Sequence, residues 1–285
     1  MHYTIRHLTH FRYSQPIRES YMEVRKRPRS DDGQRCLEFN LTVSPEARVH
    51  SYTDPLGNTV HHFDVAKLHE DLRVTAVSLV ERAALKTIPE RLPADAWIGI
   101  DRLAEDFGNW DWLHPSHFAQ PTDSLRAFAE ECKLTRRDDP LTILHEINKT
   151  LHASLAYVPK STRVDSPIDE CLQNRKGVCQ DFAHIFIALA RHLRIPCRYV
   201  SGHLFHRPTK ESSSIAEDAS HAWAEALLPE LGWIGFDPAN NSPAGQNHIR
   251  IAVGRDYADV PPSRGIFKGT AESDLSVHVD VGAVS

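Results

Sequence analysis

The sequence predicts an α+β protein that is preceded by a small all-β domain. Residues 1–85 carry short runs of alternating polar and apolar side chains, the pattern of half-buried strands. From 123 to 193 the apolar residues recur at helical spacing, and after 197 the period of two returns. A block of helices followed by antiparallel strands is typical of α+β domains and not of repeating βαβ units. The later strands are expected at 197–205, 221–228, 232–237, 248–253 and 275–281.

The domain predicted over 1–85 is a small antiparallel sandwich or barrel. Turn signals such as Asp31-Asp32-Gly33 separate its runs, which are rich in Val, Thr, Tyr and Phe. We find no nucleophile, metal cluster or phosphate loop in it, so we expect it to support its neighbour or to present a surface to a partner protein. Its strands are expected at 3–13, 19–27, 35–45, 47–53, 59–65 and 72–81.

Residues 86–122 are expected to form a packed connection, because they lose periodicity but carry prolines and a cluster of aromatic side chains. A second domain then covers 123–285. Thr122-Asp123 and Asp139-Pro140 are typical of helix starts, and Ser166-Pro167 repeats the signal before a short helix.

The stretch RKGVCQDFAHIFIALARHL at 175–193 forms the centre of this second domain. Gly177 ends the preceding element, and Cys179 lies in the first turn of a strongly amphipathic helix. Unpaired N–H groups and the positive end of the helix dipole favour the thiolate there, which is the nucleophilic form of cysteine. On this residue alone, an inert buried cysteine is the commoner outcome.

Two later stretches supply groups that would activate such a thiol. Ser220-His221-Ala222-Trp223 begins one predicted strand, and Gly235-Phe236-Asp237-Pro238 ends the next. A short turn between them makes His221 and Asp237 cross-strand neighbours at the open end of a hairpin. If the central helix starts at the same end, Cys179 meets a base and a carboxylate that orients it. Taken singly, His221 is an ordinary strand-end residue and Asp237 an ordinary turn residue, so spacing leaves both interpretations open.

Composition excludes several classes of function. The net charge of −5 gives no reason to expect nucleic acid or an anionic membrane as a partner. No apolar run reaches the length of a membrane span, and the start lacks a signal-peptide pattern. The five cysteines are widely spread without a C-x-x-C pair, which argues against a disulfide framework and a structural zinc site. We therefore expect a reducing, cytoplasmic setting.

The stretches GVCQDFAHIFIALARHLRIPCRYVSGHL and SHAWAEALLPELGWIGFDPANN resemble the transglutaminase-like cysteine peptidase superfamily, specifically its bacterial branch with an N-terminal β domain. The resemblance covers about 140 to 241 and extends weakly to the β domain and to 248–265. It implies a papain- or transglutaminase-like core, in which the helix bearing the cysteine packs on an antiparallel sheet. It also implies that Cys179 is the nucleophile, His221 the general base and acid, and Asp237 the residue that orients the imidazole.

From these residues and the resemblance we expect acyl transfer on a peptide or another amide-containing substrate, through a thioester acyl-enzyme. Hydrolysis of a peptide or isopeptide bond is favoured, because free cross-linking of glutamine to lysine would harm the host compartment. Amine transfer of the transglutaminase type and a non-catalytic binding module that retains the fold stay open as alternatives. The sequence contains no EF-hand pattern, so we expect neither a metal nor another cofactor.

Weaker predictions concern the surroundings of the thiol. The N–H of Cys179 is expected to donate to the oxyanion, with Gln173 or Tyr157 as the second donor. Trp223 is expected to pack between the hairpin and the central helix and to border the substrate cleft. The polar, serine-rich stretch 206–219 is predicted to be an exposed loop, which could gate that cleft.

Overall fold

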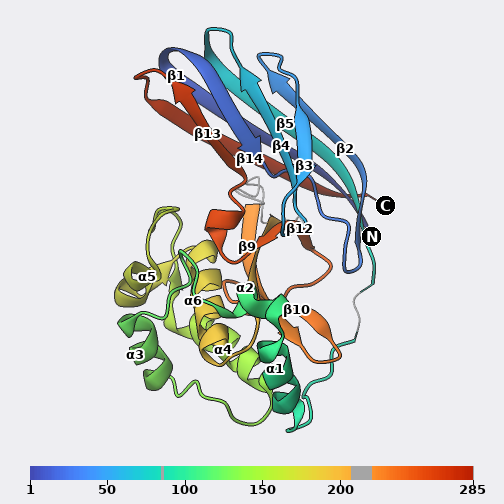
Figure 1. Ribbon diagram of the computed structural model, residues 1–285, viewed down its shortest axis with the longest axis vertical. Helices are drawn as coiled ribbons and strands as arrows, with labels where there is room; N and C mark the ends of the chain where they lie inside the picture. Colours follow the sequence, from blue (N-terminus) through green and yellow to red (C-terminus); the bar gives the residue numbers. More distant parts are fainter. Residues whose placement is uncertain (85–86, 207–219, 285) are drawn as a thin grey trace, which may run out of the picture.

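The computed structural model describes residues 1–84, 87–206 and 220–284. A β-rich unit occupies one end of the molecule and an α+β unit the other, and the two chain ends lie beside each other (Figure 1). The predicted fold class, an α+β part preceded by an all-β region, is confirmed. Beyond His206, the loop predicted at 206–219 lies outside the described residues.

One long strand, β1 (His2–Val24), organises the N-terminal unit. The sequence predicted two separate strands here, but the chain continues through Ser14-Gln15-Pro16. The first half of β1 pairs with β5 (His69–Arg82) and the second half with β4 (Thr59–Val65). Pro16 cannot donate to a ladder, and it lies where the pairing with β5 shifts its register.

The C-terminal strands return to this N-terminal unit. β13 (Ser263–Lys268) and β14 (Ser273–Val284) both pair with β1, whereas the sequence had placed everything after 123 in the second domain. An alternating pattern identifies a strand but not its partner, which explains this correction. The remaining strands of the unit are β2 (Gln34–Ser44), beside β5, and β3 (His50–Thr53), beside β4.

The helical block of the second unit confirms two predicted starts. The Thr122 hydroxyl accepts from the N–H of Leu125 at 3.2 Å, and Asp139 caps its helix in the same manner. Two helices that the sequence did not predict, α1 and α2, lie within the connection at 86–122. None of the described helices is both long and apolar enough to cross a bilayer. The elements are α1 (Ala96–Glu105), η1 (Phe107–Asn109), α2 (Trp110–Leu113), α3 (Asp123–Glu131), α4 (Pro140–Ser154), α5 (Ile168–Asn174) and α6 (Cys179–His192).

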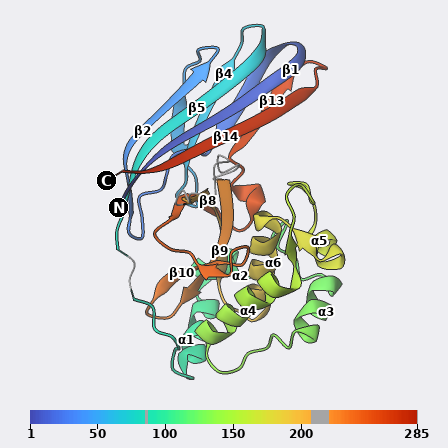
Figure 2. The ribbon, with the colours of Figure 1, turned by 180° about the vertical axis from the view of Figure 1, so that it is seen from behind.

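An antiparallel sheet in the order β11-β10-β9-β8-β12 completes the second unit. Ala222, Ala224 and Ala226 on one face of β9 share the main core with α6. In Figure 2 the helices α3 to α6 lie together on one side of β9. The sheet strands are β8 (Cys197–Leu204), β9 (Ser220–Leu228), β10 (Gly232–Asp237), β11 (Ser242–Pro243), β12 (His248–Gly254), and a separate pair consists of β6 (Ala156–Tyr157) and β7 (Lys176–Gly177), while η2 spans Tyr257–Asp259.

Candidate active site

Cys179 is the first residue of α6 and is half-buried. Gly177 is needed just before it, because a Cβ there would lie 2.9 Å from the carboxylate of Asp181. Asp181 accepts hydrogen bonds from the N–H of Val178 at 2.8 Å and from the Thr162 hydroxyl at 2.6 Å. These bonds secure the start of the helix. They leave the N–H of Cys179 among those that have no acceptor within the helix.

His221 and Asp237 come from the open end of the predicted hairpin. Phe236 pairs with Ala224, so the two residues are diagonal neighbours and not directly opposite. Nε2 of His221 nevertheless lies 2.8 Å from Oδ2 of Asp237. The carboxylate is 0% exposed, so this bond is shielded from water. The second ring nitrogen, Nδ1, is therefore the one that remains available to the thiol of Cys179.

The charge on His221 depends on both neighbours. Burial lowers the pKa of the imidazole, but hydrogen bonds to Asp237 and Cys179 outweigh burial and raise the pKa to about 10. Burial raises the pKa of the Asp237 carboxyl, but the hydrogen bonds from His221 and His248 outweigh burial and hold this pKa well below its usual range. An imidazolium therefore persists between a carboxylate and the thiol at neutral pH.

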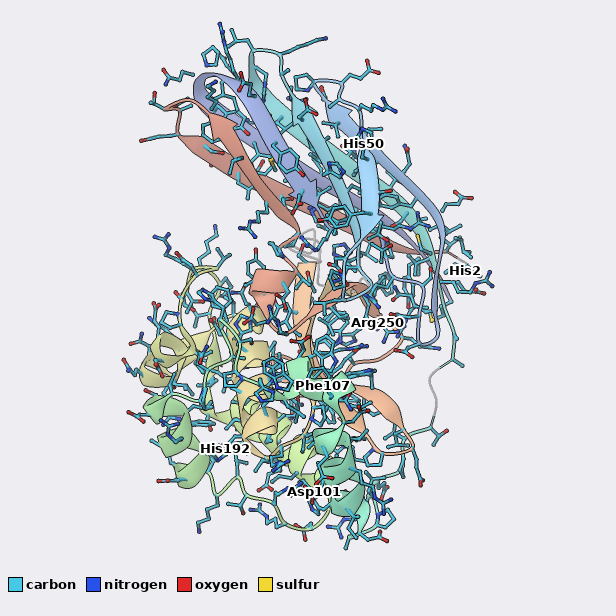
Figure 3. All side chains as sticks on the ribbon, in the orientation of Figure 1. His2, His50, Asp101, Phe107, His192 and Arg250 are labelled. Atoms are coloured by element: carbon cyan, nitrogen blue, oxygen red, sulfur yellow. The ribbon has the colours of Figure 1, made fainter. Side chains whose placement is uncertain are left out.

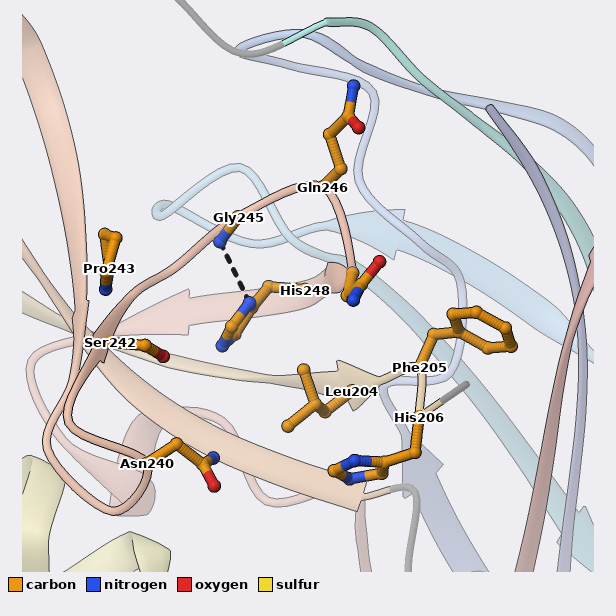
Figure 4. Close-up of a pocket in the computed structure, with 10 residues that line it drawn as sticks. Leu204, Phe205, His206, Asn240, Ser242, Pro243, Gly245, Gln246 and His248 are labelled. Atoms are coloured by element: carbon orange, nitrogen blue, oxygen red, sulfur yellow. Dashed lines mark hydrogen bonds between the residues drawn. The ribbon is translucent and has the colours of Figure 1, made fainter. Parts of the chain in front are cut away.

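Sequence reasoning missed two residues that hold Asp237. Nε2 of His248 lies 3.0 Å from Oδ2 of Asp237, and the side-chain amide of Asn240 donates to the same oxygen at 2.8 Å. The N–H of Gly245 donates to Nδ1 of His248, as the dashed line in Figure 4 shows, so Nε2 must carry the proton. The signal for Asn240 was its place three residues after Asp237 in a turn. His248 carried no comparable local signal.

The side chains of His221, Asp237 and His248 place potential metal ligands near one another. Single atoms of His221, Asp237 and His248 lie within 4.8 Å of one another. A metal would need the unprotonated Nε2 of His248, yet the bond from Gly245 keeps the proton on that nitrogen. The donor set fits a hydrogen-bonded carboxylate better than a metal centre.

The weaker predictions have mixed outcomes. Trp223 does not pack between the hairpin and α6, because its ring joins Val200 and Val253 on the other face of the sheet. It is buried and stacks near His221, with ring centroids 6.2 Å apart, so it supports the imidazole. Its place at the substrate cleft is still a prediction.

The two predicted oxyanion donors are both exposed. Tyr157 lies on β6, whose partner β7 ends at Gly177, and its ring centroid is 6.4 Å from that of Phe182. Gln173 lies on α5, and no described hydrogen bond joins its side chain to the three central residues. The second oxyanion donor is thus still a prediction.

Both units of the chain match models of known protein families. Residues 3–81 match the bacterial transglutaminase-like N-terminal region, and residues 126–238 match the transglutaminase-like superfamily core. An uncharacterized protein of Mycobacterium leprae is 31% identical over 275 residues, which cover 96% of each chain. The chain belongs to the transglutaminase-like superfamily.

Two further similarities extend this transglutaminase-like assignment. The crystal structure of a candidate cysteine protease from Cytophaga hutchinsonii matches with a TM-score of 0.78 at 22% identity, covering 100% of this chain and 91% of that chain. This likeness shows that the two chains share one fold across both units. A protein-glutamine gamma-glutamyltransferase of Pseudomonas aeruginosa is 27% identical over 117 residues, which are 40% of this chain and 18% of that protein.

Proposed function

We propose that this transglutaminase-like protein is a cysteine hydrolase that cleaves a peptide or isopeptide bond. One observation carries the proposal: the imidazole of His221 lies 2.8 Å from the buried carboxylate of Asp237, and its pKa is raised to about 10, against burial, by that carboxylate and by Cys179. A nucleophile, a base and a group that orients the base are the minimum for covalent acyl transfer. The same arrangement in a purely structural role would need no thiol at a helix start.

The proposed reaction has two stages, formation of a thioester and its hydrolysis. The Cys179 thiolate attacks the amide carbonyl carbon, and the N–H of Cys179 is placed to donate to the developing oxyanion. His221 gives its proton to the leaving amine as the C–N bond breaks, which leaves a thioester. His221 then takes a proton from water and the resulting hydroxide attacks the thioester. The C–S bond breaks, a carboxylic acid leaves, and the Cys179 thiolate is restored beside the imidazolium.

Amine transfer is the second candidate for this site. The observation that favours it is the similarity to the Pseudomonas aeruginosa protein-glutamine gamma-glutamyltransferase over the core residues. In that reaction a primary amine, and not water, attacks the same thioester. A non-catalytic module that retains the fold is disfavoured, because all three reactive groups are present, His221 is bonded to Asp237, and Cys179 contributes to the raised pKa of His221.

The proposed setting is the cytoplasm. All five cysteines are free, which supports this proposal because cytosolic thiols are kept reduced. A partner protein bound by the N-terminal unit also stays a proposal, without a particular surface assigned to it.

The activated thiol can be tested by alkylation. Iodoacetamide at pH 7 is expected to modify Cys179 at least about tenfold faster than Cys36 or Cys132, because thiolate is the reactive form. Burial raises the pKa of both control thiols, which makes them internal references within one sample. His221→Ala should slow Cys179 and leave the other two unchanged. Equal rates at the three cysteines, read by peptide mass spectrometry, would contradict the proposal.

A separate measurement distinguishes water from amine as the acceptor. A library of glutamine-containing peptides is incubated with the enzyme, with and without a fluorescent primary amine. The products are then identified by mass spectrometry. Cleaved or deamidated products that are insensitive to the amine support hydrolysis. Incorporation of the amine in preference to water supports transfer. Cys179→Ala is the matched control for both arms.

A further inference from the structure

A cavity of about 370 Å³ lies where the two units meet. The N-terminal unit contributes Arg82 and Asp32 to its wall, and the catalytic sheet contributes Trp223, Trp233 and Arg250. Figure 3 shows Arg250 at this junction. The volume is within the range of small-molecule sites, which is about 300–1,000 Å³.

Arg82 is a buried charge without an ionic partner among the described residues. Arg82 is only 8% exposed. One nitrogen of its guanidinium group, Nη2, donates to the carbonyl of Gly245 at 3.2 Å. The other two nitrogens, Nε and Nη1, are buried and have no acceptor. Burial lowers the pKa of Arg82 to about 10, so the guanidinium is still charged at neutral pH. A buried charge left in this state is strongly destabilising unless an anion pairs with it.

The other buried atoms around the cavity that lack a hydrogen-bond partner are also donors. Nε1 of Trp223 and Nε of Arg250 are buried without an acceptor, so every unpartnered buried side-chain atom among the lining residues is a donor. The lining carboxylates are already engaged: Glu225 bonds Arg198 and Arg250, and Asp32 lies 3.7 Å from Arg250. None of these carboxylates forms an ion pair with the guanidinium of Arg82.

We propose that this cavity binds a small organic anion, a monocarboxylate with an apolar body. Its carboxylate would accept from the unpartnered donors of Arg82, with Trp223 and Arg250 at the same wall. Its body would lie against apolar residues of the lining such as Leu231, Ile234 and Ala244. A monoanion would pair with the one guanidinium among the described lining residues that lacks an ion pair, whereas a dianion would bring a second negative charge that has no such partner.

The cavity is connected to the candidate active site but separate from its thiol. Arg82 donates to the carbonyl of Gly245, whose N–H donates to Nδ1 of His248, and His248 in turn donates to Asp237. The cavity wall reaches His248, but Cys179, His221 and Asp237 are not part of the wall, so binding there can be measured without catalysis.

The test is calorimetric titration of the full chain with benzoate as the probe. Saturable binding is expected, together with a rise in the unfolding temperature, while benzamidine, a cation of the same shape, should not bind. Arg82→Gln is expected to weaken benzoate binding by about tenfold or more, the effect of losing a hydrogen bond to a charged group. The matched control is Arg35→Gln, which removes an exposed arginine of the same unit and should leave the affinity unchanged.

Two more variants keep the test decisive if Arg82→Gln fails to fold. Trp223→Phe keeps an aromatic ring, although a smaller one, but removes the unpartnered N–H, and should weaken benzoate binding. Cys179→Ala should leave benzoate binding intact, and a loss there would mean that benzoate occupies the active site, which overturns the proposal. The proposal is also overturned if benzoate does not bind, if benzamidine binds equally well, or if neither Arg82→Gln nor Trp223→Phe changes the affinity for benzoate. Binding of inorganic phosphate in place of benzoate would also overturn the carboxylate assignment.

Discussion

Asp237 is the residue on which the hydrogen bonds of the candidate site converge. Its Oδ2 accepts from His221, His248 and Asn240, and its Oδ1 accepts from the N–H of Asn240 at 3.2 Å. A carboxylate held by this many donors cannot rotate freely, so the imidazole bonded to it keeps one orientation. His248 is thus a positioning residue, which acts on the thiol through Asp237 and His221.

His248→Ala is expected to slow alkylation of Cys179 by roughly tenfold, about 1.4 kcal/mol, which is the order expected for a lost hydrogen bond to a charged group. His248→Gln, whose amide can still donate, should recover part of the rate, and a purely structural role would predict no such recovery. The control is His192→Ala, because that side chain is exposed at the far end of α6. Unchanged reactivity in a folded His248→Ala protein would argue against positioning.

At the scale of elements, the start of α6 is shaped by the close approach of β7. A Cβ on Gly177 would lie 2.6 Å from Sγ of Cys171 and 2.9 Å from Oδ2 of Asp181. Such contacts force the backbone apart, and the backbone of this turn carries Cys179. The glycine is needed for packing here and not for an unusual backbone angle, since its φ is not in the left-handed region.

Gly177→Ala is therefore expected to lower the free energy of unfolding by about 1–3 kcal/mol, the usual effect of overpacking, and to slow alkylation of Cys179. Urea titration and thiol labelling measure the two effects. Gly108→Ala is the matched control, because its nearest neighbour is a flexible carboxylate oxygen of Asp106 at 3.3 Å. Equal stability of the two variants would show that α6 tolerates the added methyl group.

At the scale of the whole molecule, a buried ionic network ties the units together. Glu225 of β9 accepts from Arg198 at 2.7 Å and from Arg250 at 3.3 Å. Arg250 also donates to the backbone carbonyls of Asp31 and Asp32 in the N-terminal unit. The catalytic sheet and the N-terminal unit thus share one set of charges. Without the buried carboxylate of Glu225, Arg198 would keep, among the described residues, only Asp32 at 3.7 Å, and Arg250 only Asp31 at 3.3 Å and Asp32 at 3.7 Å.

Glu225→Gln is expected to cost about 3–5 kcal/mol at pH 7, as for other buried pairs that lose one partner. Burial raises the pKa of Glu225, but Arg198 and Arg250 outweigh it and lower the pKa from 4.5 to about 2. The stabilisation is therefore complete above pH 4.5 and is lost as the pH falls through about 2. Urea unfolding of wild type and variant across this range measures it, with exposed Glu105→Gln as the control. A difference that does not shrink in acid would refute the assignment to Glu225.

Local patterns predicted much of the candidate site. The helix start at Cys179, the hairpin with His221 and Asp237, and the caps at Thr122 and Asp139 all follow from signals within a few residues of each position. The connection at 86–122 was harder, because its helices α1 and α2 are short and its prolines and aromatic residues obscure their periodicity. Trp223 was placed on the wrong face, since an aromatic residue in a strand is compatible with either side of a sheet.

By itself the sequence determined the element types, the order of the two units and the thiol at a helix start, because periodicity and capping act within one turn or one strand. Only the tertiary structure decided the rest. It brought β14 back to β1, placed His248 on Asp237, and left two nitrogens of Arg82 without an acceptor beside a cavity. These contacts join residues far apart in the chain, and their partners are selected by packing and by the need to satisfy buried polar groups, which no local pattern encodes.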